Sequence, residues 1–266
     1  MQNNTLYASK TTYEFEKARI SESKEPLETV KRNMKGTYPE ELEYLDDFYD
    51  KDTGTSGTAF KDKDTGEVIL AYTGTNLDND QWSDVVKTDI GRIALGLGNG
   101  HVNPARKFYE KIRAEYGDDI ILTGHSLGGN LAQWIALYYN VQKTIIYNPA
   151  PLHISSDNIV DVVDKLTKDT IIRKIGWLEP AKFVSRQLQP IQEEYLEKIM
   201  KLEEIFTGQV LRIQSESDLL TMVAYALKGK YKVLSLEDNQ DNGMQAMAVA
   251  PVNERGEVDT RRIVIA

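Results

Sequence analysis

Apolar positions in the first 50 residues recur at helical spacing within a mostly polar and acidic sequence. The clearest case is the set Tyr44, Leu45, Phe48 and Tyr49, which is surrounded by carboxylates. Such spacing is typical of helices that bury one face and expose the other. We therefore expect residues 1–50 to form a helical N-terminal segment that packs on the core.

Beyond residue 50 the pattern changes to short apolar runs that alternate with amphipathic segments. Residues 57–60 and 67–72 flank the turn-rich sequence from Lys61 to Gly66, which predicts a hairpin of two strands. Further strands are expected over residues 119–123, 143–148 and 209–214, and helices over residues 103–116 and 130–140. Strands that are apolar throughout and are joined by helices are typical of a parallel sheet, so we expect an α/β fold.

A long segment, residues 153–207, separates the last two of these strands. It holds three amphipathic stretches, and Pro180 and Pro190 lie between them. One helix is enough to connect neighbouring parallel strands, so this segment is an insertion at the carboxyl edge of the sheet. We expect either a lid over a site or additional core. The domain of residues 51–266 would then include the helical insertion 153–207.

Composition and charge exclude several classes of protein. The chain of 266 residues has 32 Lys and Arg against 41 Asp and Glu, so the formal net charge is −9. This charge repels phosphates and argues against a nucleic-acid binder. No Cys is present, which excludes disulfides, thiolate nucleophiles and sulfur-ligated metal sites.

Targeting and cofactor signals are also missing from the sequence. No apolar stretch is long enough for a membrane span, and the first residues lack the order of a signal peptide. We therefore expect a cytoplasmic protein, or one exported by a route that needs no signal peptide. The acidic residues Asp78, Asp80, Asp84 and Asp89 do not have the spacing of an EF-hand, and no phosphate loop or dinucleotide fingerprint occurs. We expect neither a metal nor a cofactor.

The sequence Gly124-His125-Ser126-Leu127-Gly128 fits the pattern G-x-S-x-G of a nucleophile elbow. An apolar strand precedes it and a helix rich in Leu, Ala and Trp follows it, which is the strand–turn–helix context that the motif requires. In that context the serine hydroxyl stands clear of the sheet. The sequence therefore predicts Ser126 as a nucleophile.

On these residues the chain resembles the class 3, or fungal-type, lipases of the α/β-hydrolase fold. Residues 122–129 are similar to that family's nucleophile segment, and residues 71–75 are similar to its F-R-G-T segment, with Tyr72 and Thr73 in place of Phe and Arg. The resemblance implies a mostly parallel α/β-hydrolase sheet with helices on both faces. It also implies cleavage of carboxylic esters of lipids, and transient contact with a membrane or micelle surface.

The resemblance further implies site residues around Ser126. Thr75 would supply one oxyanion-hole donor and the backbone N–H of Leu127 the second. Asp218, which follows the strand expected at residues 209–214, is similar to the family's acid, and Glu216 is its nearest competitor. A weaker resemblance connects the chain to lipase-like effectors that some Gram-positive bacteria export without a cleaved signal peptide.

The general base is the open question. The family places a His after the acid, but His101, His125 and His153 are the three histidines and all of them precede Asp218. Three explanations stay open: a catalytically inactive domain, a base used out of order, or a fragment of a longer protein. The base used out of order would be His153 or His101, with His153 as the preferred non-standard candidate. The third explanation is suggested by apolar residues at the end of the chain, which an ordinary final hairpin explains equally well.

Two functions follow from these features. The first is a serine hydrolase of lipase or esterase type that acts through an acyl-Ser126 intermediate. The second is a hydrolase-fold module without activity, whose helical segments bind a protein partner.

Overall fold

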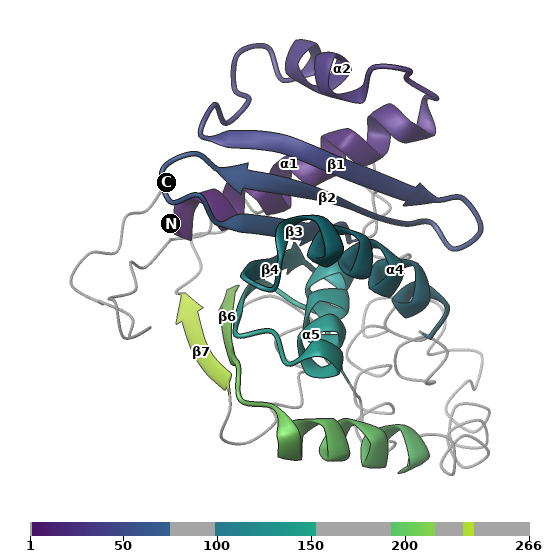
Figure 1. Cartoon of the computed structure of the whole chain (residues 1–266), viewed down its shortest axis with the longest axis vertical. Helices are drawn as coiled ribbons and strands as arrows, with labels where there is room; N and C mark the ends of the chain where they lie inside the picture. The colour runs from purple at the N-terminus through teal and green to yellow at the C-terminus, as the bar shows by residue number, and fades with distance from the viewer. Residues whose placement is uncertain (1, 75–98, 153–192, 216–230, 237–266) are drawn as a thin grey trace, which may run out of the picture.

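The described strands form a single mixed sheet, and helices pack against it (Figure 1). The computed structural model describes residues 2–74, 99–152, 193–215 and 231–236, and within them seven strands lie in the order β1-β2-β3-β4-β5-β6-β7. The strands are β1 (Leu42–Asp50), β2 (Thr55–Asp62), β3 (Val68–Tyr72), β4 (Ile120–His125), β5 (Lys143–Tyr147), β6 (Gln209–Ser215) and β7 (Tyr231–Leu236). The helices are α1 (Gln2–Ile20), α2 (Pro26–Asn33), α4 (Asn99–Tyr116), α5 (Leu127–Tyr139) and one over residues 193–205.

Strand direction divides the sheet in two. Strands β1, β2 and β3 pair antiparallel, whereas β3 through β7 are parallel. Tyr72 lies opposite Gly124, and His125 lies opposite Tyr147. The carboxyl ends of β3, β4, β5 and β6 therefore meet at one edge, where α/β sheets carry their sites. The prediction of an α/β fold with a mostly parallel sheet is confirmed.

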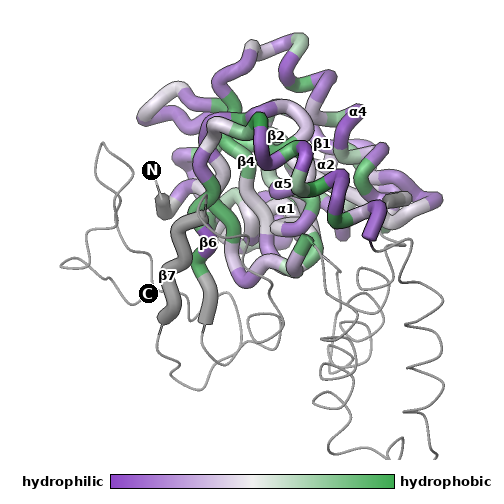
Figure 2. Tube along the Cα trace, turned by 90° about the horizontal axis from the view of Figure 1, so that it is seen from below, coloured by the Kyte–Doolittle hydropathy of each residue, from purple (hydrophilic) through white to green (hydrophobic). Residues whose placement is uncertain are grey.

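Helices cover both faces of the sheet, as the alternation along β3 requires. Leu70 and Tyr72 belong to the core cluster that includes α4 and α5, whereas Ile69 and Ala71 belong to the cluster that includes α1 and α2. Figure 2 shows hydrophobic positions concentrated along the central strands and hydrophilic positions towards the outside. Strands β2 through β5 are thus buried between two layers of helices.

The expectation of a helical segment over residues 1–50 is wrong at its end. Helices α1 and α2 are present, but Leu42–Asp50 forms β1, an edge strand of the sheet. A bulge between Tyr44 and Asp46 interrupts its register with β2. The extra residue breaks the alternation of a strand, so that Tyr44 faces one core cluster while Leu45 and Phe48 face the other. In sequence this produces a spacing that imitates a helix.

The other expected elements occur close to their predicted places. Helix α4 begins at Asn99 rather than at residue 103, with Pro104 inside it. Pro104 is the sixth residue of this helix, beyond the four N–H groups that have no intrahelical partner, so the helix lacks the hydrogen bond that another residue there would donate to the carbonyl of Gly100. Among the helices that the structure describes, none has the length and apolar content needed to cross a bilayer.

The end of the insertion 153–207 belongs to the core. Tyr195, Ile199 and Phe206 are buried in the same cluster as α4 and α5. The ring centroids of Tyr195 and Trp134 are 5.0 Å apart. Residues 153–192, for which a lid was an alternative, lie outside the described residues.

Candidate active site

Ser126 occupies the turn between β4 and α5 with a backbone conformation that serine rarely adopts. Its φ is 56° and its ψ is −123°, values that mirror the ordinary β region and are normally held by glycine. A residue with a side chain in such a region costs about 1–3 kcal/mol and is found mainly at functional sites. The Ser126 side chain makes no capping hydrogen bond to α5, although it stands at the N-cap position. This strained strand–turn–helix backbone is the geometry that a nucleophile elbow requires.

Three glycines allow this turn to form. A Cβ on Gly124 would lie 2.4 Å from the carbonyl carbon of Gly128, and one on Gly128 would lie 2.1 Å from the carbonyl oxygen of Tyr72. A Cβ on Gly129 would lie 2.7 Å from the Cβ of Pro149. Helix α5 therefore starts in direct backbone contact with β3 and β4. The glycines of the motif are required by the space available.

The loop after β5 supports the elbow from the other side. The backbone N–H of Ala150 donates a 2.9 Å hydrogen bond to the carbonyl oxygen of Ser126. Asn130 donates from its side-chain amide to the carbonyl oxygen of Pro151, over 2.6 Å, and Gln133 donates to that of Ala150, over 3.2 Å. This loop is thereby attached to the first turns of α5.

The end of β3 reaches the elbow through Gly74. A Cβ on Gly74 would lie 2.7 Å from the carbonyl oxygen of His125 and 3.2 Å from the Cβ of Ser126. The Gly74 N–H donates to the hydroxyl oxygen of Tyr13, over 3.1 Å, and the same hydroxyl is 3.1 Å from Nδ1 of His125. Gly74, Ser126, His125 and Tyr13 thus form one contiguous group.

The two described histidines have their Nδ1 atoms engaged by residues other than Ser126. Nδ1 of His101 is 2.9 Å from the hydroxyl of Thr55, and Nδ1 of His125 bonds Tyr13. Burial lowers the pKa of His125 from 6.5 to about 4, so this ring is neutral near pH 7. Burial also raises the pKa of Tyr13.

The structure brings part of the predicted site together. Ser126 and Leu127 are described, and Leu127 is the first residue of α5, where the backbone N–H groups of a helix attract negative charge. Thr75, His153 and Asp218 lie outside the described residues, as do Glu216 and the aspartates that follow Thr75. Sequence reasoning missed Tyr13, because no motif marks a tyrosine in a polar helix as a neighbour of the elbow.

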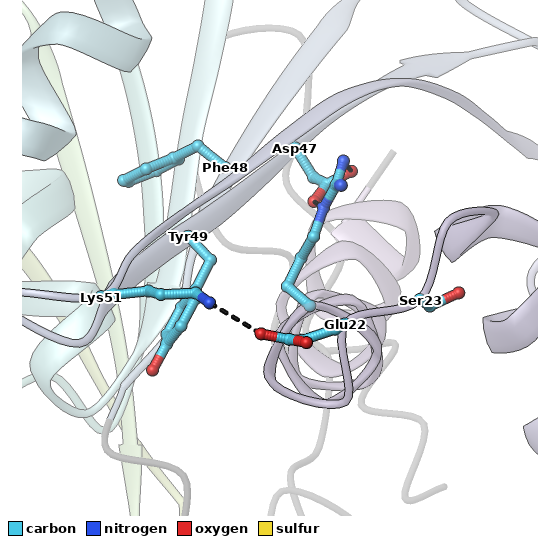
Figure 3. A pocket seen from close by; sticks show the side chains of 7 residues that line it. Glu22, Ser23, Asp47, Phe48, Tyr49 and Lys51 are labelled. Carbon is cyan, nitrogen blue, oxygen red and sulfur yellow. Dashed lines mark hydrogen bonds and ion pairs between the residues drawn. The ribbon is translucent and has the colours of Figure 1, made fainter.

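A surface pocket of about 520 Å³ is lined by residues that do not belong to the turn around Ser126 (Figure 3). The lining residues come from the end of α1 and from β1 and its turn: Arg19, Glu22, Ser23, Asp47, Phe48, Tyr49 and Lys51. Arg19 pairs with Asp47, and Lys51 pairs with Glu22 over 3.0 Å. These charges compensate one another. Across the described segments, no group of three or more His, Asp or Glu is placed to hold a metal ion.

Several solved structures are similar to this chain at low sequence identity. The lipase from Rhizopus microsporus var. chinensis is 12% identical, with a TM-score of 0.43, and the match covers 82% of this chain and 67% of the lipase. The capsule O-acetyltransferase of Neisseria meningitidis serogroup A is 16% identical, with a TM-score of 0.43 and coverage of 75% and 89%. The Francisella virulence factor BioJ is 14% identical, with a TM-score of 0.37 and coverage of 85% and 84%.

A comparison with curated proteins finds no match. A family model does match: the Tle-like phospholipase domain, over residues 18–171. That range contains the elbow, the end of β3 and the loop after β5, which together make up the described site. It also covers more than half of the 266 residues. The chain belongs to the family of Tle-like phospholipase domains.

Proposed function

We propose that the protein is a serine hydrolase that cleaves carboxylic esters of lipids through an acyl-Ser126 intermediate. The observation that carries this proposal is the backbone of Ser126, at φ 56° and ψ −123°, on a glycine-lined turn between β4 and α5. A strained conformation of this kind persists only where the surrounding structure enforces it. The family's description as phospholipase-like supports a phospholipid ester as the substrate class.

The chemistry assigned to Ser126 is acyl transfer. Its Oγ attacks the ester carbonyl carbon while the hydroxyl proton passes to a general base, and the carbonyl oxygen becomes an oxyanion. The N–H of Leu127, at the N-terminus of α5, is suited to donate to that oxyanion, and Thr75 is proposed as the second donor. The alcohol then leaves with the proton, and water hydrolyses the acyl-serine by the same steps.

For the base we propose His153, oriented by Asp218. His153 follows Ala150 by three residues, and the Ala150 N–H bonds the Ser126 carbonyl, so about 10 Å of chain is available to reach the elbow. Asp218 follows Ser215, the last residue of β6, which ends at the same edge of the sheet. His125 is less suited, because a hydrogen bond accepted from Tyr13 at Nδ1 leaves its proton on Nε2, the nitrogen that would take the serine proton. His101 is less suited because Nδ1 bonds the hydroxyl of Thr55, whereas a carboxylate orients the base of the usual triad.

A fluorophosphonate probe tests the nucleophile. We expect labelling of the folded wild-type chain, release of fatty acid from phospholipid micelles, and loss of both in Ser126→Ala. For the base, His153→Ala should lower kcat by about a thousandfold or more, whereas His101→Ala, the matched control, should leave it near wild type. No labelling of a folded wild-type chain contradicts the proposed enzyme. Equal activity of His153→Ala and wild type contradicts the assigned base.

A second function is supported by the histidine count. All three histidines precede Asp218, and the two described ones have other partners. The alternative is a hydrolase-fold module without activity that binds a protein partner through its helical segments. An unlabelled but folded wild-type chain is the result that favours this alternative.

A further inference from the structure

Helix α1 docks on the sheet through polar side chains in addition to apolar ones such as Ala8 and Phe15. Along its inner face, hydroxyl and carboxylate groups bond partners on the strands. These pairs are Thr5 with Tyr147 (2.7 Å), Ser9 with Thr123 (2.8 Å), Thr12 with Thr58 (2.9 Å) and Glu16 with Ser56 (2.8 Å). Hydrogen bonds are directional and need short distances, so this interface fixes the position of α1 more closely than an apolar contact does.

Tyr13 extends this polar face to the elbow. Its hydroxyl lies 3.1 Å from the Gly74 nitrogen and 3.1 Å from Nδ1 of His125, the residue before Ser126. A Cβ on Gly74 would lie only 2.6 Å from that hydroxyl, so the two groups are in close contact. One side chain of α1 therefore joins the end of β3 to the end of β4.

The donors and acceptors in this group define the direction of the hydrogen bonds. The Gly74 N–H is a donor, so the Tyr13 oxygen accepts from it. The Tyr13 hydroxyl then has its own proton to donate, and Nδ1 of neutral His125 can accept it. This assignment makes Nε2 the protonated nitrogen of His125. Replacing Tyr13 by Phe removes the acceptor for Gly74 and the donor for His125 together.

We propose that Tyr13 is a positioning residue of the active centre, which holds the Gly74 backbone against the Ser126 turn and so orients the chain that leads into Thr75. The proposal rests on the proposed function, in which Thr75 donates to the oxyanion. It also makes α1 part of the active centre, although the family match begins at residue 18 and leaves Tyr13 outside. Oxyanion donors act only when they are held in place before the reaction, so a loosened Gly74 lowers the rate of acyl transfer more than substrate binding.

The kinetic test compares Tyr13→Phe with Ser9→Ala. Both remove a side-chain hydroxyl of α1 that bonds the sheet, but the partner of Ser9 is Thr123, away from Gly74. We expect Tyr13→Phe to lower kcat on a phospholipid ester by about 10- to 100-fold with KM nearly unchanged, and Ser9→Ala to change kcat less than twofold. Equal losses in the two variants, or an unchanged kcat in Tyr13→Phe, overturn the proposal.

Amide hydrogen exchange at Gly74 provides a readout that does not depend on activity. In the wild-type chain this amide should be protected, and in Tyr13→Phe it should exchange at least tenfold faster, with smaller changes in the centre of β4. An unprotected Gly74 amide in wild type overturns the proposal even if the variant does not fold. If wild type is inactive yet Gly74 responds to Tyr13→Phe, the proposed function fails while the positioning contact stands.

Discussion

Ser126→Gly should stabilise the protein relative to Ser126→Ala. Both variants lack Oγ, so they differ only in the Cβ that the strained backbone must accommodate. At φ 56° and ψ −123° a residue with a Cβ carries about 1–3 kcal/mol of strain that glycine does not. Glycine in turn loses about 0.4–1 kcal/mol through the greater freedom of the unfolded chain. The net expectation is that Ser126→Gly is about 1–2 kcal/mol more stable than Ser126→Ala.

The assay is urea unfolding followed by far-UV circular dichroism, with the midpoint and slope fitted for each variant. In a thermal scan the same difference corresponds to about 2–8 °C in Tm, since 1 kcal/mol shifts the Tm of a domain of this size by about 2–4 °C. At positions where φ is negative, the variant with Ala is instead more stable than the variant with Gly. The reasoning is refuted if Ser126→Ala proves as stable as Ser126→Gly or more stable, because the turn then stores no backbone strain.

Three further predictions concern the surroundings of the elbow. Gly128→Ala should destabilise the fold by about 3 kcal/mol or more in urea unfolding, since its Cβ would meet backbone at 2.1 Å, whereas Gly100→Ala, whose nearest atom is 3.9 Å away, should be tolerated. His125 has a folded-state pKa near 4, below its unfolded value of 6.5, so the unfolded state binds the extra proton between these values. Stability should therefore fall by about 3 kcal/mol as the pH drops from 6.5 to 4, and His125→Gln should flatten that part of the urea-midpoint profile; an equally steep profile in the variant contradicts the assignment. Ile199→Ala, at a fully buried position, should cost about 2–4 kcal/mol, and Ile205→Ala, at a position 69% exposed, should cost little; equal costs would show that residues 193–205 are not part of the core.

The predictions that succeeded rest on local signals. The order of β4, the elbow and α5 was readable because glycine spacing, an apolar run and a helical pattern are adjacent in the chain. The parallel sheet was readable because its strands, buried on both faces, are mostly apolar and hold only isolated polar residues such as Thr123 and Thr144. The prediction for β1 failed because a bulge shifts the alternation by one residue, and a single sequence does not display the partner strand that reveals it.

The part of the site around Tyr13 needed the folded chain. Tyr13 is 61 residues from Gly74 and 112 from His125, and the bonds among them arise only where α1 crosses the sheet. The buried face of α1 mixes apolar residues such as Ala8 and Phe15 with hydroxyl and carboxylate groups, so the sequence does not show the continuous apolar stripe by which a docking helix is recognised. A helix with such a composition suggests exposure to water, whereas here its polar groups find partners on the strands.

The sequence by itself determined the α/β class and the strand–turn–helix around Ser126, because each depends on residues that are neighbours along the chain. It also determined that all three histidines precede Asp218, so that no histidine stands where the lipases it resembles carry their general base. Only the tertiary structure decided that Ser126 adopts a strained turn, that His125 faces α1 and is held neutral by burial, and that Gly74 rests on Tyr13. These features depend on the crossing of α1 over β3 and β4, a contact between distant segments that no local pattern encodes.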